Sequence, residues 1–131
     1  MIVLDSSVVV AILRAEPGYE RFVEAIDSTE AAIMSNANFL EVAIVMIRRF
    51  GAASLSRLQH VRASLSVELR PVDEQQLEYA IGAYAGFGKG TGHPARLNYG
   101  DCFAYALARA TDCPLLYKGD DFARTDIRSA F

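Results

Sequence analysis

Carboxylate side chains recur in this sequence at or soon after the ends of short apolar runs. Asp5 follows Ile-Val-Leu, Glu41 interrupts Asn-Phe-Leu and Val-Ala-Ile-Val, and Asp101 opens a stretch reading Cys-Phe-Ala-Tyr-Ala-Leu-Ala. Asp120 and Asp121 follow Pro-Leu-Leu-Tyr-Lys-Gly. If the apolar runs are parallel strands of one sheet, the acids meet at its carboxyl edge, where they could hold a hard divalent cation. The chemistry that this arrangement predicts is metal-dependent chemistry on phosphate groups.

The segments that must position these acids alternate between strand-like and helix-like patterns along the whole chain. This alternation predicts an α/β fold made of one domain, residues 1–131, with a small, mostly parallel sheet of four to five strands sandwiched by helices. The expected strands are 1–4, 31–34, 67–72 and 115–117. The expected helices are 8–13, 19–26, one that ends near Arg49 and is capped by Ser35, Asn36 or Asn38, 54–66, 74–87 and 100–110.

Composition narrows the class of protein. Of the 131 residues 52% are apolar and 22% charged, and the net charge is −3, values typical of one folded domain. No stretch approaches the ~20 apolar residues of a membrane span, and no signal peptide is evident, so we expect a cytoplasmic protein without a membrane partner. The acidic balance argues against a broad basic face for nucleic acid, but it does not exclude a nucleic-acid substrate.

Each acid also has a purely structural explanation, because Asp and Glu are favoured in the first turn of helices. Asp5 could simply cap a helix. Asp101 lies three residues after Asn98, as in a capping box, and Glu41 lies three residues after Asn38. One of the two adjacent acids at 120 and 121 would likewise cap the segment that follows. Only if the acids lie close together in space can a metal site be distinguished from a set of separate helix caps.

Three or four carboxylates in one cleft raise each other's pKa, so a cation that neutralises them is the favoured explanation. Mg²⁺ suits such a site because it prefers oxygen ligands and keeps several waters, and Mn²⁺ should substitute for it. Zinc is disfavoured, since His60 and His93 lie in no zinc motif and Cys102 and Cys113 lack paired spacing. We expect both cysteines to be reduced thiols in the core.

Four segments carry a resemblance to a known family: residues 2–7 (Ile-Val-Leu-Asp-Ser-Ser), 35–41 (Ser-Asn-Ala-Asn-Phe-Leu-Glu), 97–106 (Leu-Asn-Tyr-Gly-Asp-Cys-Phe-Ala-Tyr-Ala) and 115–126 (Leu-Leu-Tyr-Lys-Gly-Asp-Asp-Phe-Ala-Arg-Thr-Asp). Together they resemble the PIN-domain ribonucleases, specifically the VapC toxins of bacterial toxin–antitoxin pairs. The match follows the family's order over essentially the whole chain.

The resemblance implies a Mg²⁺- or Mn²⁺-dependent endoribonuclease, the toxin of a type II pair. Asp5, Glu41 and Asp101 correspond to the family's first three acids, and the fourth is Asp121 or, with a local shift, Asp120. Asp5 and Asp101 would chiefly hold the metal, and the other acids would position the attacking water or a second ion. In-line attack by this metal-activated water would break the P–O3′ bond and leave a 5′-phosphate.

Further expectations concern supporting residues and partners. Ser7 matches a small hydroxyl residue near the family's site, and Asn98 is a second supporting residue. The resemblance also implies a VapB-type antitoxin that inserts a C-terminal segment into the active site, and a homodimer or a hetero-oligomer with that antitoxin. Two alternatives stay open: a structure-specific DNA nuclease on the same fold, and a non-catalytic binding or scaffold module whose acids are caps.

Overall fold

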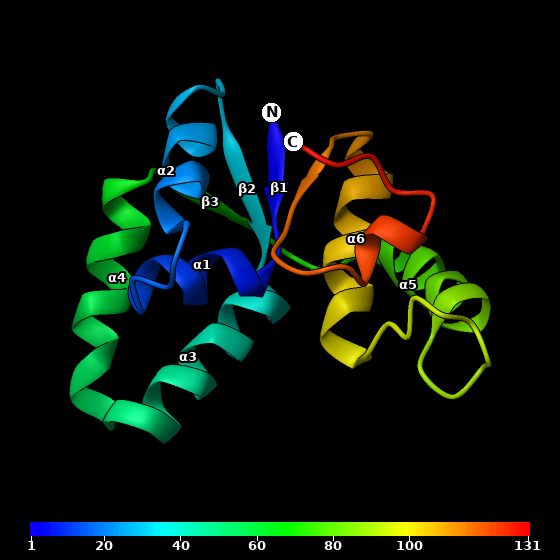
Figure 1. Cartoon of the computed structure of the whole chain (residues 1–131), viewed down its shortest axis with the longest axis horizontal. Coiled ribbons are helices and arrows are strands. Elements are labelled where there is room, and N and C mark those ends of the chain that lie inside the picture. The colour runs from blue at the N-terminus through cyan, green and yellow to red at the C-terminus, as the bar shows by residue number, and fades with distance from the viewer.

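Strands and helices alternate along most of the chain in the computed structural model, which describes residues 1–131 (Figure 1). The elements are β1 (Ile2–Leu4), α1 (Ser6–Leu13), α2 (Tyr19–Asp27), β2 (Ala32–Ser35), α3 (Asn36–Phe50), the 3₁₀ turn η1 (Ala52–Ser54), α4 (Leu55–Ser64), β3 (Val67–Arg70), α5 (Glu74–Phe87), α6 (Tyr99–Thr111), β4 (Leu115–Leu116) and the 3₁₀ turn η2 (Phe122–Arg124).

The four strands form one sheet in the order β3-β2-β1-β4, and every neighbouring pair is parallel. β1 therefore lies inside the sheet, where it pairs with β2 through Ile2 and Ala32 and with β4 through Val3 and Leu115. The predicted α/β fold with a small parallel sheet is confirmed. Because the chain first builds β1, β2 and β3 to one side and then crosses to β4, a topological switch point falls between β1 and β4.

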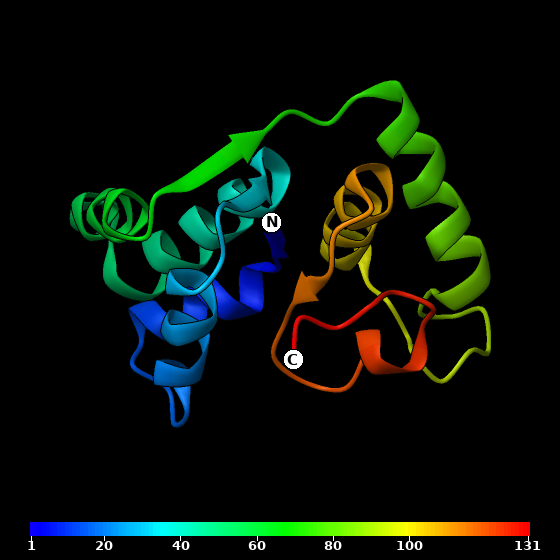
Figure 2. The same ribbon diagram turned by 90° about the horizontal axis from the view of Figure 1, so that it is seen from above.

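Helices cover both faces of the sheet, as the view from above shows (Figure 2). Side chains alternate between the two faces along each strand. Ile2 and Leu4 of β1 join the core formed with α1 to α4, whereas Val3 joins the core formed with α5 and α6. Both cysteines are buried and free, as expected. None of the helices is both long and apolar enough to cross a lipid bilayer.

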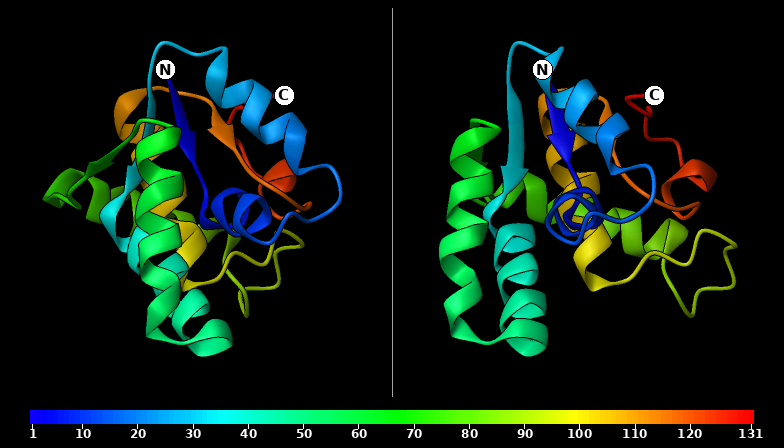
Figure 3. Two further views of the ribbon diagram at one scale, coloured as in Figure 1. Left: turned by 90° about the vertical axis from the view of Figure 1, so that its left-hand side faces the viewer. Right: turned by 60° about the vertical axis from the view of Figure 1, so that its left-hand side comes forward.

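Several element ends differ from the sequence expectation for local reasons. α1 begins at Ser6, two residues early, because Asp5 supplies its N-cap. The helix expected over 54–66 is α4, which begins one residue later and ends two residues earlier, after the 3₁₀ turn η1, and the strand expected over 67–72 ends at Arg70. α3 and α4 run antiparallel side by side (Figure 3), and Gly51, with φ of 80°, ends α3 before η1 as predicted.

Candidate active site

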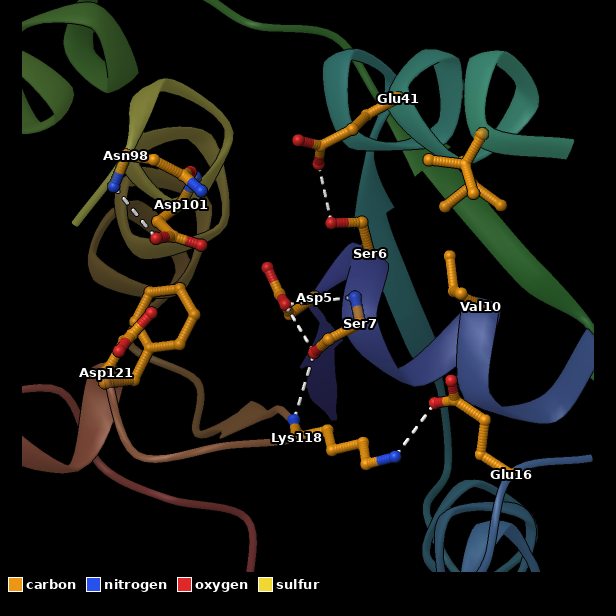
Figure 4. Close-up of a pocket in the computed structure, with 13 residues that line it drawn as sticks. Asp5, Ser6, Ser7, Val10, Glu16, Glu41, Asn98, Asp101, Lys118 and Asp121 are labelled. Carbon is orange, nitrogen blue, oxygen red and sulfur yellow. Dashed lines mark hydrogen bonds and ion pairs between the residues drawn. The ribbon is translucent and has the colours of Figure 1, made fainter. Parts of the chain in front are cut away.

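Four of the acids predicted from the sequence, together with Glu16, border one cavity of about 360 Å³ at the switch point (Figure 4). Asp5 follows β1, Glu41 lies on α3, Asp101 lies in the first turn of α6, and Asp121 follows β4. The neighbouring strands β1 and β4 leave a crevice at this position of an open parallel sheet, and ligands bind in such crevices in folds of this kind. The structure thus brings together the acids that the sequence placed at strand ends.

Asp120 and Asp121 are separated by the structure. Asp121 borders the cavity, whereas Asp120 lies in the exposed loop before it and does not line the cavity. Asp121 precedes η2, but its side chain makes no capping hydrogen bond. Of the two candidates for a fourth acid, only Asp121 therefore borders the cavity.

Asp5 is the most buried of the acids, with only 4% of its surface exposed. Its Oδ2 caps α1 by accepting hydrogen bonds from the Ser7 N–H at 3.0 Å and from the Ser7 hydroxyl. Its Oδ1 is buried without any donor in the protein. Burial raises the pKa of Asp5 and the negative charge of Glu41 raises it further, while the Ser7 hydrogen bonds act in the opposite direction.

Asp101 combines a capping role with a place in the cavity. Its Oδ2 accepts a hydrogen bond from the Asn98 N–H at 2.9 Å, and the Asn98 side chain accepts one from the Asp101 N–H at 2.9 Å, which completes a capping box. Burial, followed by the charges of Asp5, Asp121 and Glu41, raises the pKa of Asp101 to about 7, although the Asn98 N–H opposes the shift. Asp101 therefore belongs to the capping box of α6 and borders the cavity at the same time.

Glu41 is held by donors from two helices and is not a capping partner. Its Oε1 accepts hydrogen bonds from the Ser6 hydroxyl at 2.6 Å and from Asn38 Nδ2 at 3.3 Å. The N-cap of α3 is Ser35, so the alternative in which Asn38 caps the helix and Glu41 is its partner is wrong. Asn38 is instead buried, and it also donates to the Gly100 carbonyl at 2.9 Å.

Sequence reasoning missed an ion pair at the edge of the cavity. Lys118, the only basic residue among those lining it, pairs through Nζ with Glu16 Oε1 at 2.9 Å. Its backbone N–H donates to the Ser7 hydroxyl at 3.0 Å, which ties the loop after β4 to α1. No local pattern could have revealed the pair, because the two residues are 102 positions apart.

The comparisons with known proteins identify the family of this fold. A family model described as PIN domain matches residues 2–128. The chain belongs to the PIN domain family. VapC ribonuclease Mb2780c of Mycobacterium bovis is 41% identical over 129 residues, 98% of each chain. Ribonuclease VapC30 of Mycobacterium tuberculosis is 44% identical over 125 residues, 95% of each chain.

Solved structures share the fold of this PIN domain. Mycobacterium tuberculosis VapC20, described as a sarcin-ricin loop cleaving toxin, matches with a TM-score of 0.75 at 18% identity, over 97% of this chain and 96% of that one. A toxin-antitoxin complex from Klebsiella pneumoniae matches with a TM-score of 0.73 at 16% identity, over 100% and 98% of the two chains. At such identities the likeness shows the architecture alone.

The cavity of this PIN domain fits a hard divalent cation. Asp5 offers a buried carboxylate oxygen without a donor, and the pKa of Asp101 is raised by burial and then by neighbouring negative charge; both features are costs that a cation would reduce. No three side chains of the His, Cys, Asp and Glu types are set closely enough to enclose an ion by themselves. Mg²⁺ needs no such enclosure, because it is commonly held by one or two carboxylates, several waters and a substrate phosphate.

Proposed function

We propose that this PIN domain is a Mg²⁺- or Mn²⁺-dependent endoribonuclease and the toxin of a type II toxin–antitoxin pair. The observation that carries the proposal is the convergence of Asp5, Glu41, Asp101 and Asp121 on one cavity, with one oxygen of Asp5 lacking a donor. The proposal is supported by relatives named as ribonucleases, which match at 41% and 44% identity along nearly their whole length.

In this proposal Asp5 and Asp101 would hold the ion, whose positive charge would orient the scissile phosphate and lower the pKa of a water molecule. Glu41 and Asp121 accept hydrogen bonds from the attacking water and keep it in line with the leaving oxygen. The water oxygen bonds to phosphorus, the P–O3′ bond breaks and O3′ takes up a proton, so the products end in a 5′-phosphate and a 3′-hydroxyl.

The proposed partners are an RNA substrate, a VapB-type antitoxin and a second copy of the chain. A second copy is supported by exposed apolar side chains on three helices around the start of α6. We call this set, together with the half-buried Phe103 of α6, the apolar surface; its exposed members are Leu40 and Ile44 on α3, Leu77, Ile81 and Tyr84 on α5, and Tyr99 on α6. Apolar patches of this kind commonly mark protein interfaces.

The test is cleavage of total bacterial RNA by purified protein freed of any bound partner, with Mg²⁺, Mn²⁺ or a chelator, alongside Asp101→Asn. We expect discrete cuts that carry 5′-phosphates, need metal and disappear in the variant. Products with a 2′,3′-cyclic phosphate would contradict attack by water, because they require the 2′-hydroxyl of the RNA as nucleophile. Preferential cleavage of competing DNA would favour the DNA nuclease, and the absence of both cleavage and metal binding would favour the scaffold module.

A further inference from the structure

Gly100, the second residue of α6, has space for no side chain, and the reason is Glu41. The three nearest heavy atoms to a Cβ added at Gly100 all belong to the Glu41 carboxyl group: Oε2 is the nearest, followed by Cδ at 2.7 Å and Oε1 at 2.8 Å. Its backbone φ is not in the left-handed region, so the conformation itself would accept any residue. The carboxylate of Glu41 therefore fills the space that a side chain at this position would take.

The same carboxylate is held from the other side by two donors. The Ser6 hydroxyl at 2.6 Å and Asn38 Nδ2 at 3.3 Å both donate to Oε1, and Oε2 accepts no hydrogen bond within the protein. Asn38 also donates to the Gly100 carbonyl at 2.9 Å. These contacts connect α1, α3 and α6 around one flexible side chain.

From these contacts we infer that Gly100, Asn38 and Ser6 are positioning residues that fix the Glu41 carboxylate against the first turn of α6, beside Asp101. A glutamate side chain has three rotatable bonds, and holding it in one place costs conformational entropy. Two donors on Oε1 and the bare Cα of Gly100 beside Oε2 restrict the carboxylate to one arrangement. For catalysis this inference rests on the proposed function; for the geometry of the side chain it does not.

A glycine at a helix contact can also serve packing alone, and stability measurements separate the two roles. A packing glycine meets backbone or core atoms, so Ala there destabilises the fold. A Cβ at Gly100 meets only the tip of a flexible side chain, which can swing away. Since Ala also favours a helix more than Gly does, Gly100→Ala should leave the Tm unchanged or raise it by up to about 4 °C.

The experiment is a double-mutant cycle of Gly100→Ala and Glu41→Ala, with Gly82→Ala on α5 as the matched control. Gly82 is an exposed helical glycine whose added Cβ would meet nothing within 4 Å. Three quantities are measured for each protein: kcat/KM for RNA cleavage, affinity for Mn²⁺ alone by calorimetry, and the Tm in chelator.

We expect Gly100→Ala to lower kcat/KM on the order of a hundredfold, because a displaced catalytic group loses its alignment. In the Glu41→Ala background the same change should have no further effect on cleavage or on Mn²⁺ affinity. Its Tm gain should be larger there than in wild type, since no carboxylate has to be displaced. Gly82→Ala should keep full activity and Mn²⁺ affinity.

Full activity of Gly100→Ala, an equal loss of activity in both backgrounds, or an equally lowered Tm in both backgrounds would overturn the inference. If wild-type protein cleaves no RNA with any metal, the proposed function fails, but the Tm and Mn²⁺ cycles still decide this inference. A Tm effect of Gly100→Ala that is independent of Glu41 would then overturn it, and a Tm gain that grows when Glu41 is removed would support it.

Discussion

At the scale of single residues, the fold places the acids of this PIN domain where their negative charges are poorly stabilised by the protein itself. Asp5 is buried with one oxygen lacking a donor, and Asp101 has a pKa raised to about 7 by burial and by the charges of Asp5, Asp121 and Glu41. A protein pays for such an arrangement in stability, as expected for groups that are set up to bind a ligand.

Asp101→Asn should stabilise the metal-free protein, and the gain should depend on pH. The folded-state pKa lies above the unfolded value, so the folded protein retains a proton between about pH 4 and about pH 7 that the unfolded chain has lost. The penalty for folding with a charged Asp101 is therefore absent below this window, grows within it and is complete above it. The Tm difference between variant and wild type, measured in chelator, should grow from pH 4.5 to pH 8.

Asp27→Asn is a suitable control, since Asp27 is exposed on α2 away from the cavity. A Tm difference for Asp101→Asn that stays constant across this pH range would contradict the assignment. At pH 8, Mn²⁺ should raise the Tm of wild type more than that of the variant, because an ion that binds only the folded state stabilises it by mass action.

The adjacent acids Asp120 and Asp121 offer a second test, in which each is the control for the other. Asp121 borders the cavity and adds to the negative charge felt by Asp101, whereas Asp120 does neither. Asp121→Asn should reduce kcat/KM for RNA cleavage by about 10- to 100-fold, as loss of a supporting group at a metal site typically does, and Asp120→Asn should have little effect. Equal losses in the two variants would show that the loop is arranged differently during cleavage.

At the scale of elements, the helix caps and the cavity acids coincide. Asp5 follows β1, caps α1 and borders the cavity, and Asp101 is the N3 partner in the capping box of α6 and also borders the cavity. Helix starts direct unsatisfied N–H groups and the positive end of the dipole toward the same sheet edge, so the positions that stabilise a cap also gather carboxylates. For these two acids, a capping role and a place at the cavity are therefore compatible.

This coincidence explains how far the sequence could predict the molecule. The strands, their parallel pairing and the gathering of acids at one edge follow from local patterns, because apolar runs and capping residues are local signals. The contacts that orient the acids are not local: Ser6 and Glu41 are 35 positions apart, and Asn38 and Gly100 are 62 apart. Such contacts depend on how α1, α3 and α6 pack, which no short sequence pattern specifies.

The capping box of α6 yields a prediction at this scale. Asn98→Ala removes the acceptor for the Asp101 N–H, which should lower the Tm by about 3 to 5 °C, since a lost N-cap costs roughly 1 kcal/mol in a domain of this size. Asn98→Ser should retain most of the stability because serine also caps. If Asn98→Ala melted with the wild-type protein, the capping box would contribute nothing to the stability of α6.

At the scale of the whole molecule, the cavity is divided between the two helical layers. Asp5 and Glu41 come from the side that carries α1 to α4, whereas Asp101 comes from α6 on the other face of the sheet (Figure 2). A buried hydrogen bond from Asn38 on α3 to the Gly100 carbonyl on α6 joins these layers. The distance between the acids is therefore set by packing across the sheet, so a partner that contacts both layers could influence the site.

The apolar surface is the part of the molecule best placed for such a partner, because it runs from α3 across the start of α6 to α5. Ile81 is 62% exposed and Tyr99 is 80% exposed, and together they leave a large apolar area in water.

We expect the purified chain to be a dimer in sedimentation velocity at micromolar concentration. Ile81→Glu should shift it to monomer, because burying an unpaired carboxylate in an apolar interface is costly. Gln75→Glu, an exposed site on the same helix, should add the same charge without changing the dimer. If the wild-type protein sediments as a monomer at every concentration, the apolar surface would be free for the antitoxin. Adding the antitoxin should then slow the exchange of backbone amide hydrogens in α5 and α6 around Ile81 and Tyr99.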